Sequence, residues 1–168
     1  MKLIICYIGQ DVEDYVKLSL DSINGVADHI VFIDGGSNDK TLQILKEYGF
    51  EHPIDPQKQK YILIERQYEH KLNDANSRAR TAYLDFVKQH FDGEMCLVLD
   101  PDELVDYDVN VRDFVKRVEE HLKFEEGKDY IFHPRMHHFI GDLAHEDSSQ
   151  QYHVCVGRLF RISKTLSY

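Results

Sequence analysis

Short apolar runs alternate along the chain with longer stretches in which apolar residues recur every three or four positions. A short run rich in apolar residues is typical of a strand that is buried on both faces. Apolar residues at positions 12, 16, 20 and 23 share one face of a helix, which an Asn-Gly pair ends. The pattern predicts strands over residues 2–8, 29–34, 61–65 and 95–99, and helices over 11–23, from a cap at 37–39 to 49, over 73–90 and over 111–122.

The alternation of strand and helix predicts an α/β sandwich with a mostly parallel central sheet, helices on both faces and right-handed crossovers. Beyond residue 127 the pattern is less regular. Residues 130–132 and 154–156 resemble strands on either side of a His-rich loop, and we expect some antiparallel strands near the C-terminus. A sheet of this kind binds its ligand at the carboxyl ends of its strands.

Length and composition narrow the class of protein. The 168 residues are 42% hydrophobic and 30% charged, which indicates one globular domain rather than a disordered or fibrous chain. No apolar run reaches the roughly 20 residues of a membrane helix. The first residues lack a small-residue cleavage site, so we expect a cytoplasmic protein without a transmembrane segment.

Charge and cysteine content exclude further classes. The net charge of -10, without any basic run, argues against a nucleic-acid partner. Cys6, Cys96 and Cys155 stand in apolar stretches and form no CxxC pair. We therefore predict buried free thiols in a reducing compartment.

Aspartates follow two of the predicted strands. Asp34 ends the second strand, and Asp100 and Asp102 follow the fourth. Side chains two positions apart can point the same way and face one ligand. Hard cations such as Mg²⁺ and Mn²⁺ prefer carboxylate oxygens and complete their shell with substrate phosphates. The alternative interpretation of Asp100-Pro101-Asp102 is a surface turn after a strand.

The segment that follows the second strand, Asp34-Gly35-Gly36-Ser37, predicts a tight turn into a helix. Its glycines would let the backbone approach a ligand closely, and the helix N-terminus would favour an anion. A plain turn with a helix cap would use the same residues. Neither the GxGxxG dinucleotide motif nor the GxxxxGK[ST] phosphate loop is present.

These segments carry a resemblance to a known family. Residues 30–41, IVFIDGGSNDKT, resemble the "IVVVDDGSTDGT" signature of family 2 glycosyltransferases, which have the GT-A fold. Residues 97–103, LVLDPDE, resemble that family's "LFLDADE", its DxD motif. An Arg-bearing helix precedes the DxD strand in the family, as Arg78 and Arg80 do here. The resemblance covers residues 1–105 and predicts a Rossmann-like GT-A sandwich.

The resemblance implies roles for individual residues. Asp34 would contact the nucleotide base, and Arg80 or Arg78 would reach the base or the diphosphate. Asp100 would bind the ribose or the metal's water shell, and Asp102 would ligate Mn²⁺ or Mg²⁺. The nucleotide-binding set also includes Tyr7, Gly35 and Gly36.

Two positions depart from the family pattern. Gly35 stands where many relatives have a second Asp, and Thr81 follows Arg80 where Asn is common. Both arginines have an alternative interpretation as solvated helix charges.

The resemblance also implies an activity: transfer of a sugar, with inversion, from a nucleotide-diphosphate donor. A UDP-sugar is favoured as the donor, and the acceptor is a saccharide, a lipid-linked molecule or a protein. One alternative is a Mg²⁺-dependent phosphatase of the haloacid dehalogenase type, although that motif normally follows the first strand. Another is a non-catalytic domain that binds the nucleotide sugar.

The C-terminal third carries weaker signals. We expect residues 106–168 to be a partial acceptor-side region, in a chain that is a truncated or minimal form. Asp142 and Glu146 are the candidate catalytic bases, and the His-rich loop lacks the HExxH spacing of a zinc site. The segment Arg158-Leu159-Phe160-Arg161 resembles an "RLFR" segment of some of these transferases, and its arginines are predicted either to bind an anion or to be surface charges on a strand.

Overall fold

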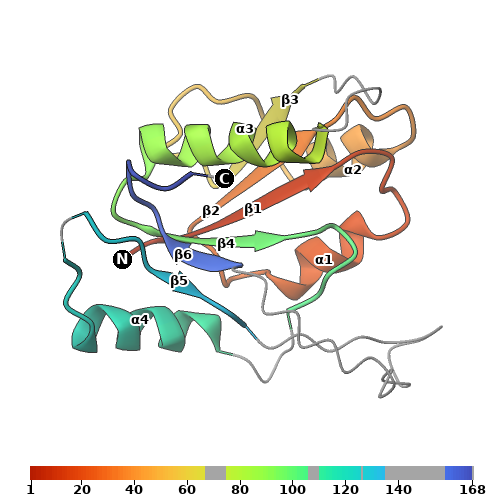
Figure 1. Ribbon diagram of the computed structural model, residues 1–168. Helices are drawn as coiled ribbons and strands as arrows, with labels where there is room; N and C mark the ends of the chain where they lie inside the picture. The colour runs from red at the N-terminus through yellow and green to blue at the C-terminus, as the bar shows by residue number, and fades with distance from the viewer. Residues whose placement is uncertain (67–74, 106–109, 126, 135–157, 168) are drawn as a thin grey trace, which may run out of the picture.

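The computed structural model describes residues 1–66, 75–105, 110–125, 127–134 and 158–167, and for residues 75–79 the backbone alone. Within these residues, six strands form one sheet in the order β3-β2-β1-β4-β6-β5 (Figure 1). The four strands from β3 to β4 are parallel, whereas β6 is antiparallel to both β4 and β5. The strands are β1 (Leu3–Gly9), β2 (His29–Asp34), β3 (Tyr61–Glu65), β4 (Met95–Leu99), β5 (Ile131–Phe132) and β6 (Leu159–Arg161).

Helices cover both faces of the sheet, as Figure 1 shows. The first core cluster joins alternate β1 residues to α1 (Val16–Ser22), α2 (Thr41–Glu47) and α4 (Val111–His121). The second joins the intervening β1 residues to α3 (Ala75–His90). Because β1 and β4 are buried on both faces, they need apolar residues at every position, as the uninterrupted runs predicted.

The order of the strands places a topological switch point between β1 and β4. The chain moves outward from β1 to β3 with α1 and α2 on one face, and then returns through α3 on the other face to β4. Because the chain reverses its direction across the sheet and also changes the face that its helices cover, all the crossovers between parallel strands have the same handedness. In sheets of this type the ligand binds outside the carboxyl ends of the strands at the switch point.

The structure confirms the predicted fold and corrects some boundaries. The first helix begins at Val16 and not at residue 11, because Asp11 takes a left-handed φ of 53° and the following residues form a turn. Of the two strands expected beyond residue 127, β5 is present, and residues 154–156 lie outside the described residues.

The structure also describes two of the three cysteines and the character of the helices. Cys6 and Cys96 are buried free thiols, as expected, with their sulfur atoms 3.6 Å apart, whereas Cys155 lies outside the described residues. Among the helices that the structure describes, none has the length and apolar character needed to cross a membrane.

Candidate active site

The turn after β2 is built around the carboxylate of Asp34, which is 1% exposed. Its Oδ2 accepts hydrogen bonds from the amides of Gly36 at 2.8 Å and Ser37 at 3.0 Å, and its Oδ1 accepts one from the Ser37 hydroxyl at 2.5 Å. Gly36 has a φ of 96°, which side chains rarely tolerate, and the Gly35 amide donates to the carbonyl of Gly9. Asp34 therefore shapes the turn, and a contact with a base stays a prediction.

A network of hydrogen bonds joins the loop after β1 to the loop after β2. Oδ1 of Asp11 accepts from the amides of Asn38 at 2.7 Å and Asp39 at 3.4 Å, and the Asp11 amide donates to the Ser37 hydroxyl at 3.0 Å. The left-handed backbone of Asp11 places its amide and its carboxylate against the same partner loop. Sequence reasoning missed this contact, since a helix was expected to begin at Asp11.

The same network continues toward α2. The Val12 amide donates to the Thr41 hydroxyl at 2.9 Å, and the Glu13 amide donates to Asp39 at 3.0 Å. In return, the Lys40 amide donates to the carboxylate of Glu13 at 2.7 Å. We call these contacts between residues 11–13 and 37–41 the loop network. It fixes the two loops relative to each other at the carboxyl edge of the sheet.

The Asp-x-Asp segment forms a tight turn directly after β4. The Glu103 amide donates to the carbonyl of Asp100 at 2.9 Å, and the Asp100 amide donates to Oε2 of Glu103 at 2.8 Å. Asp102 is exposed, and within the described residues no hydrogen bond reaches its carboxylate. A Cβ on Gly9 would lie only 2.8 Å from Cγ of Pro101, so this turn packs directly on the end of β1.

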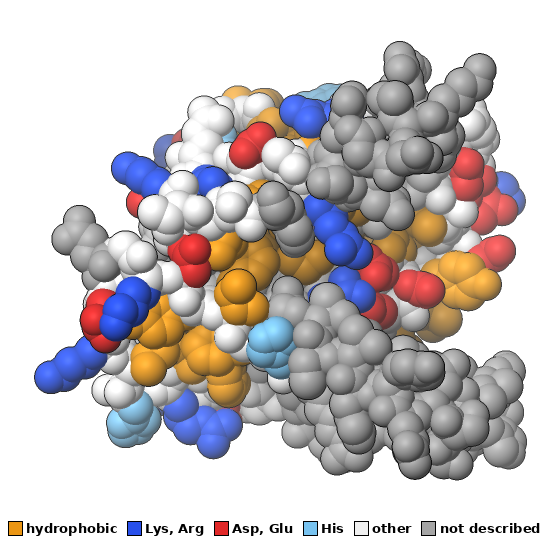
Figure 2. Space-filling model, viewed as in Figure 1, with side chains coloured by type: hydrophobic (Ala, Val, Ile, Leu, Met, Phe, Trp, Pro, Cys, Tyr) orange, Lys and Arg blue, Asp and Glu red, His pale blue; other side chains and the backbone are white. Residues whose placement is uncertain are grey.

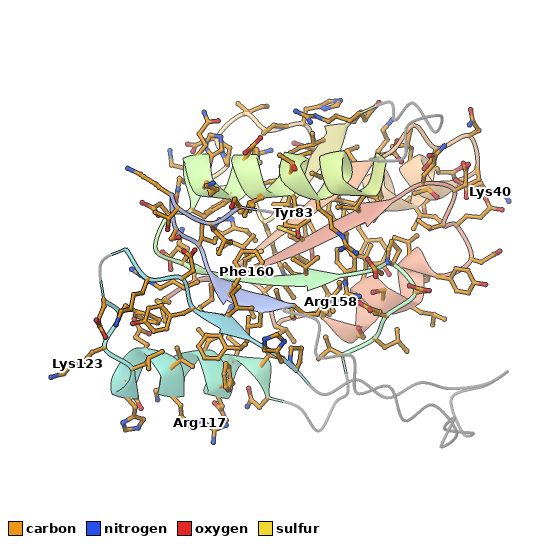
Figure 3. The ribbon with its side chains drawn as sticks, viewed as in Figure 1. Lys40, Tyr83, Arg117, Lys123, Arg158 and Phe160 are labelled. Carbon is orange, nitrogen blue, oxygen red and sulfur yellow. The ribbon has the colours of Figure 1, made fainter. Side chains whose placement is uncertain are left out.

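Arg158, immediately before β6, contacts this turn (Figure 3). Its Nη2 donates to Asp100 Oδ2 at 2.8 Å and to Glu103 Oε1 at 2.6 Å. The side chain is 11% exposed, which excludes the prediction that Arg158 is a surface charge. Figure 2 shows basic and acidic side chains gathered side by side near the carboxyl ends of β1 and β4.

Burial and charge act together on this cluster. Burial is the main influence on Glu103 and raises its pKa; the Asp100 amide and the Arg158 charge oppose the increase, and the charges of Asp100 and Asp102 reinforce it. For Arg158, burial disfavours the charge, but the bond to Asp100 and the charges of the three carboxylates outweigh it and raise its pKa. Arg158 therefore stays charged and offsets part of the negative charge of the turn formed by residues 100–103, which we call the acidic turn.

The remaining residues that the sequence predicted for the site are Tyr7, Arg78, Arg80 and the two candidate bases. Tyr7 is fully buried, stacks on Phe32 and shares a 3.0 Å hydrogen bond with the Ser19 hydroxyl, so its ring offers no surface to a ligand. Burial raises its pKa above the ordinary value despite that bond. Arg80 is an exposed residue of α3. The side chain of Arg78, and both candidate bases, Asp142 and Glu146, lie outside the described residues.

The structure therefore brings Asp34, Gly35, Gly36, Asp100 and Asp102 to one edge of the sheet, as the sequence predicted. Within the part of the chain that the structure describes, no three His, Cys, Asp or Glu side chains converge as a ready-made metal cage. A cation here would need oxygens from its ligand in addition to those of the turn.

An open, mostly parallel α/β sheet of this topology has its ligand site outside the carboxyl ends of the strands at the switch point, where these carboxylates lie. The profile of the family "Glycosyl transferase family 2" matches residues 3–152, and the chain belongs to this family. No curated protein sequence is significantly similar to the chain.

Solved structures of one protein, S. aureus TarS, share the fold. The crystal structure of S. aureus TarS 1-349 is 21% identical, with a TM-score of 0.52 over 72% of this chain and 33% of that one. Its complex with UDP is 20% identical, with a TM-score of 0.53 over 76% of this chain and 37% of that one. The chain thus spans about a third of the length of these relatives. Their similarity supports the GT-A fold predicted from the sequence.

Proposed function

We propose that this chain binds a nucleotide-diphosphate sugar, with a UDP-sugar favoured, at the carboxyl ends of β1 and β4, and that it transfers the sugar with inversion. One observation carries the proposal: Asp100 and Asp102 follow β4 at the switch point, and Asp102 is exposed without a hydrogen bond from the described residues. The family match over residues 3–152 and the similarity to a protein crystallised with UDP support it.

The donor set at this turn fits Mn²⁺ or Mg²⁺. The carboxylate of Asp102 and the second oxygen of Asp100 are the groups that would hold the cation, and a cation of this kind is commonly bound by one or two carboxylates together with substrate phosphates. When bound, it would supply Lewis-acid stabilisation of the charge that develops on the departing diphosphate.

The chain's own residues would do the remaining work. The loop network fixes the loop after β1 to the loop after β2, and the turn after β4 packs on the end of β1 through Pro101, so these loops need little reorganisation when the nucleotide binds. An acceptor hydroxyl then attacks the anomeric carbon on the face opposite the leaving group, and a carboxylate accepts its proton. Asp142 and Glu146 remain the proposed candidates for that base, and the acceptor class remains a saccharide, a lipid-linked molecule or a protein.

The proposal is tested by calorimetric titration of the chain with UDP, in the presence and absence of Mn²⁺. We expect Mn²⁺ to strengthen binding in the wild type, and Asp102→Asn to weaken the Mn²⁺-dependent binding about tenfold or more, because a charged ligand contact is worth roughly 1.5–3 kcal/mol. Asp92→Asn is the matched control, since Asp92 is exposed at the opposite end of β4.

Equal UDP affinity in wild type and Asp102→Asn would contradict the proposed metal site. Parallel assays separate the alternatives. Release of phosphate from a phosphomonoester, lost in Asp102→Asn, would support a phosphatase, whereas UDP binding without sugar transfer would support a binding domain. The position of the motif already favours the transferase, because it follows β4 and not the first strand.

A further inference from the structure

Arg158 lies where the last strand meets the acidic turn. Its carbonyl accepts a hydrogen bond of 2.8 Å from the Val98 amide, so the backbone of Arg158 is paired with β4. This pairing holds the guanidinium beside Asp100 and Glu103, at 2.8 and 2.6 Å (Figure 3). The residue comes from a segment more than fifty positions away in the sequence and is 9% exposed.

Some carboxylate oxygens of the turn accept hydrogen bonds, and others accept none from the described residues. Both oxygens of Glu103 are used, one by Arg158 and the other by the Asp100 amide. Asp100 uses Oδ2 for Arg158, and within the described residues no hydrogen bond reaches its Oδ1 or either oxygen of Asp102. Within the described residues, three carboxylate oxygens therefore accept no hydrogen bond, one on Asp100 and two on Asp102, whereas each oxygen of Glu103 already accepts one.

Stability alone explains this arrangement poorly. A buried ion pair can often be replaced by apolar residues with little loss of stability, since desolvation opposes the attraction. Among the described residues, Nε of Arg158 also finds no hydrogen-bond partner, although it is buried. An incompletely satisfied buried polar group is destabilising, so the unpartnered Nε adds to the cost of burying this side chain.

We propose that Arg158 is a positioning residue of the nucleotide site. It holds Glu103 and one oxygen of Asp100, so that the remaining oxygens of Asp100 and Asp102 face the diphosphate and its cation. Its charge also reduces the repulsion between the three carboxylates and an anionic ligand. This inference rests on the proposed function, because it assigns Arg158 a role in that same site.

The test compares Arg158→Met, Arg158→Lys and a matched control, Arg161→Met. Arg161 is also an arginine of the β6 segment whose buried Nε finds no partner in the described part of the chain, but its guanidinium lies over the ring of Phe124, 4.5 Å from the ring centroid. Two quantities are measured in each variant: the affinity for UDP at saturating Mn²⁺, and the hydrogen exchange rate of the Asp100 amide, which Glu103 protects.

We expect Arg158→Met to lower UDP affinity about tenfold or more, as for loss of a charge-assisted contact. The same variant should speed exchange at Asp100, because Glu103 loses the contact that holds it. Arg158→Lys should recover part of both effects, since it keeps a charge but not the fork of donors. Arg161→Met should leave UDP affinity and exchange at Asp100 close to the wild type.

Each other outcome overturns the inference in a distinguishable way. Unchanged affinity and exchange in Arg158→Met would remove any positioning role, and lost affinity with unchanged exchange would indicate direct contact with the nucleotide instead. Equal losses in Arg161→Met would indicate a general requirement for the β6 segment. A wild type that binds no UDP would contradict the proposed function and the ligand-facing part of this inference, while the exchange rates would still decide whether Arg158 fixes the turn.

Discussion

Gly36 is the residue on which the turn after β2 depends most directly. Its φ of 96° allows its own amide and that of Ser37 to reach the same oxygen of Asp34. A residue with a Cβ is strained in this conformation, and a β-branched residue is strained further. The turn lies at the carboxyl end of β2, on the edge where we place the nucleotide.

We therefore expect Gly36→Val to block UDP binding. Gly25→Val is the matched control, because Gly25 has a similar φ of 79° but stands in the turn after α1, with open space where a Cβ would lie. Both variants should lose about 1 kcal/mol or more of stability in urea denaturation. Only Gly36→Val should lose UDP affinity in calorimetry, and normal binding by that variant would place the nucleotide elsewhere.

The location of a single residue in the fold could be predicted from the sequence only where its position in the chain decides its surroundings. Asp34, Asp100 and Asp102 were predictable because they follow buried strands, whose carboxyl ends meet at one edge. Tyr7 was not, because whether a residue at the end of a strand faces the core or the edge depends on packing against α1 and β2. The burial of Arg158 arises from pairing with β4, which its local sequence does not reveal.

The loops between elements act as one unit through the loop network. Thr41 begins α2, is fully buried, and accepts a hydrogen bond from the amide of Val12 across the two loops. The helix predicted from residue 11 starts later because these amides bond to side chains of the other loop, and not within a helical turn. Sequence periodicity is local and cannot foresee such a competing partner.

Replacing the Thr41 hydroxyl tests the contribution of this network. Thr41→Val keeps the shape of the side chain but leaves the Val12 amide without its acceptor, and we expect a loss of about 1–3 kcal/mol in the free energy of unfolding. Thr165→Val serves as the control, since the Thr165 hydroxyl bonds to Asp129 on the exposed surface and should contribute about 0.5 kcal/mol or less. Equal effects of both substitutions on urea denaturation would show that the Thr41–Val12 bond contributes no more than a surface bond.

On the scale of the whole molecule, strand order determines where chemistry can occur. The chain returns to the middle of the sheet through α3, and this brings β4 beside β1. The alternation of apolar runs predicted the parallel sheet and both layers of helices, because each crossover must bury its apolar face. The antiparallel pairing of β6 with β4 depends on contacts over long sequence separation, so only its approximate place could be expected.

The central claim is that UDP and a divalent cation bind at the switch point between β1 and β4. Amide NMR signals of the labelled chain, recorded with UDP and Mn²⁺ and compared with UDP and Mg²⁺, test it most directly, because paramagnetic Mn²⁺ broadens the signals of nearby nuclei. We predict UDP-dependent broadening of Asp100, Asp102 and Glu103, and little effect on His29 and Gly93, at the opposite edge of the sheet. Broadening centred on that opposite edge, or none when UDP is present, would contradict the account.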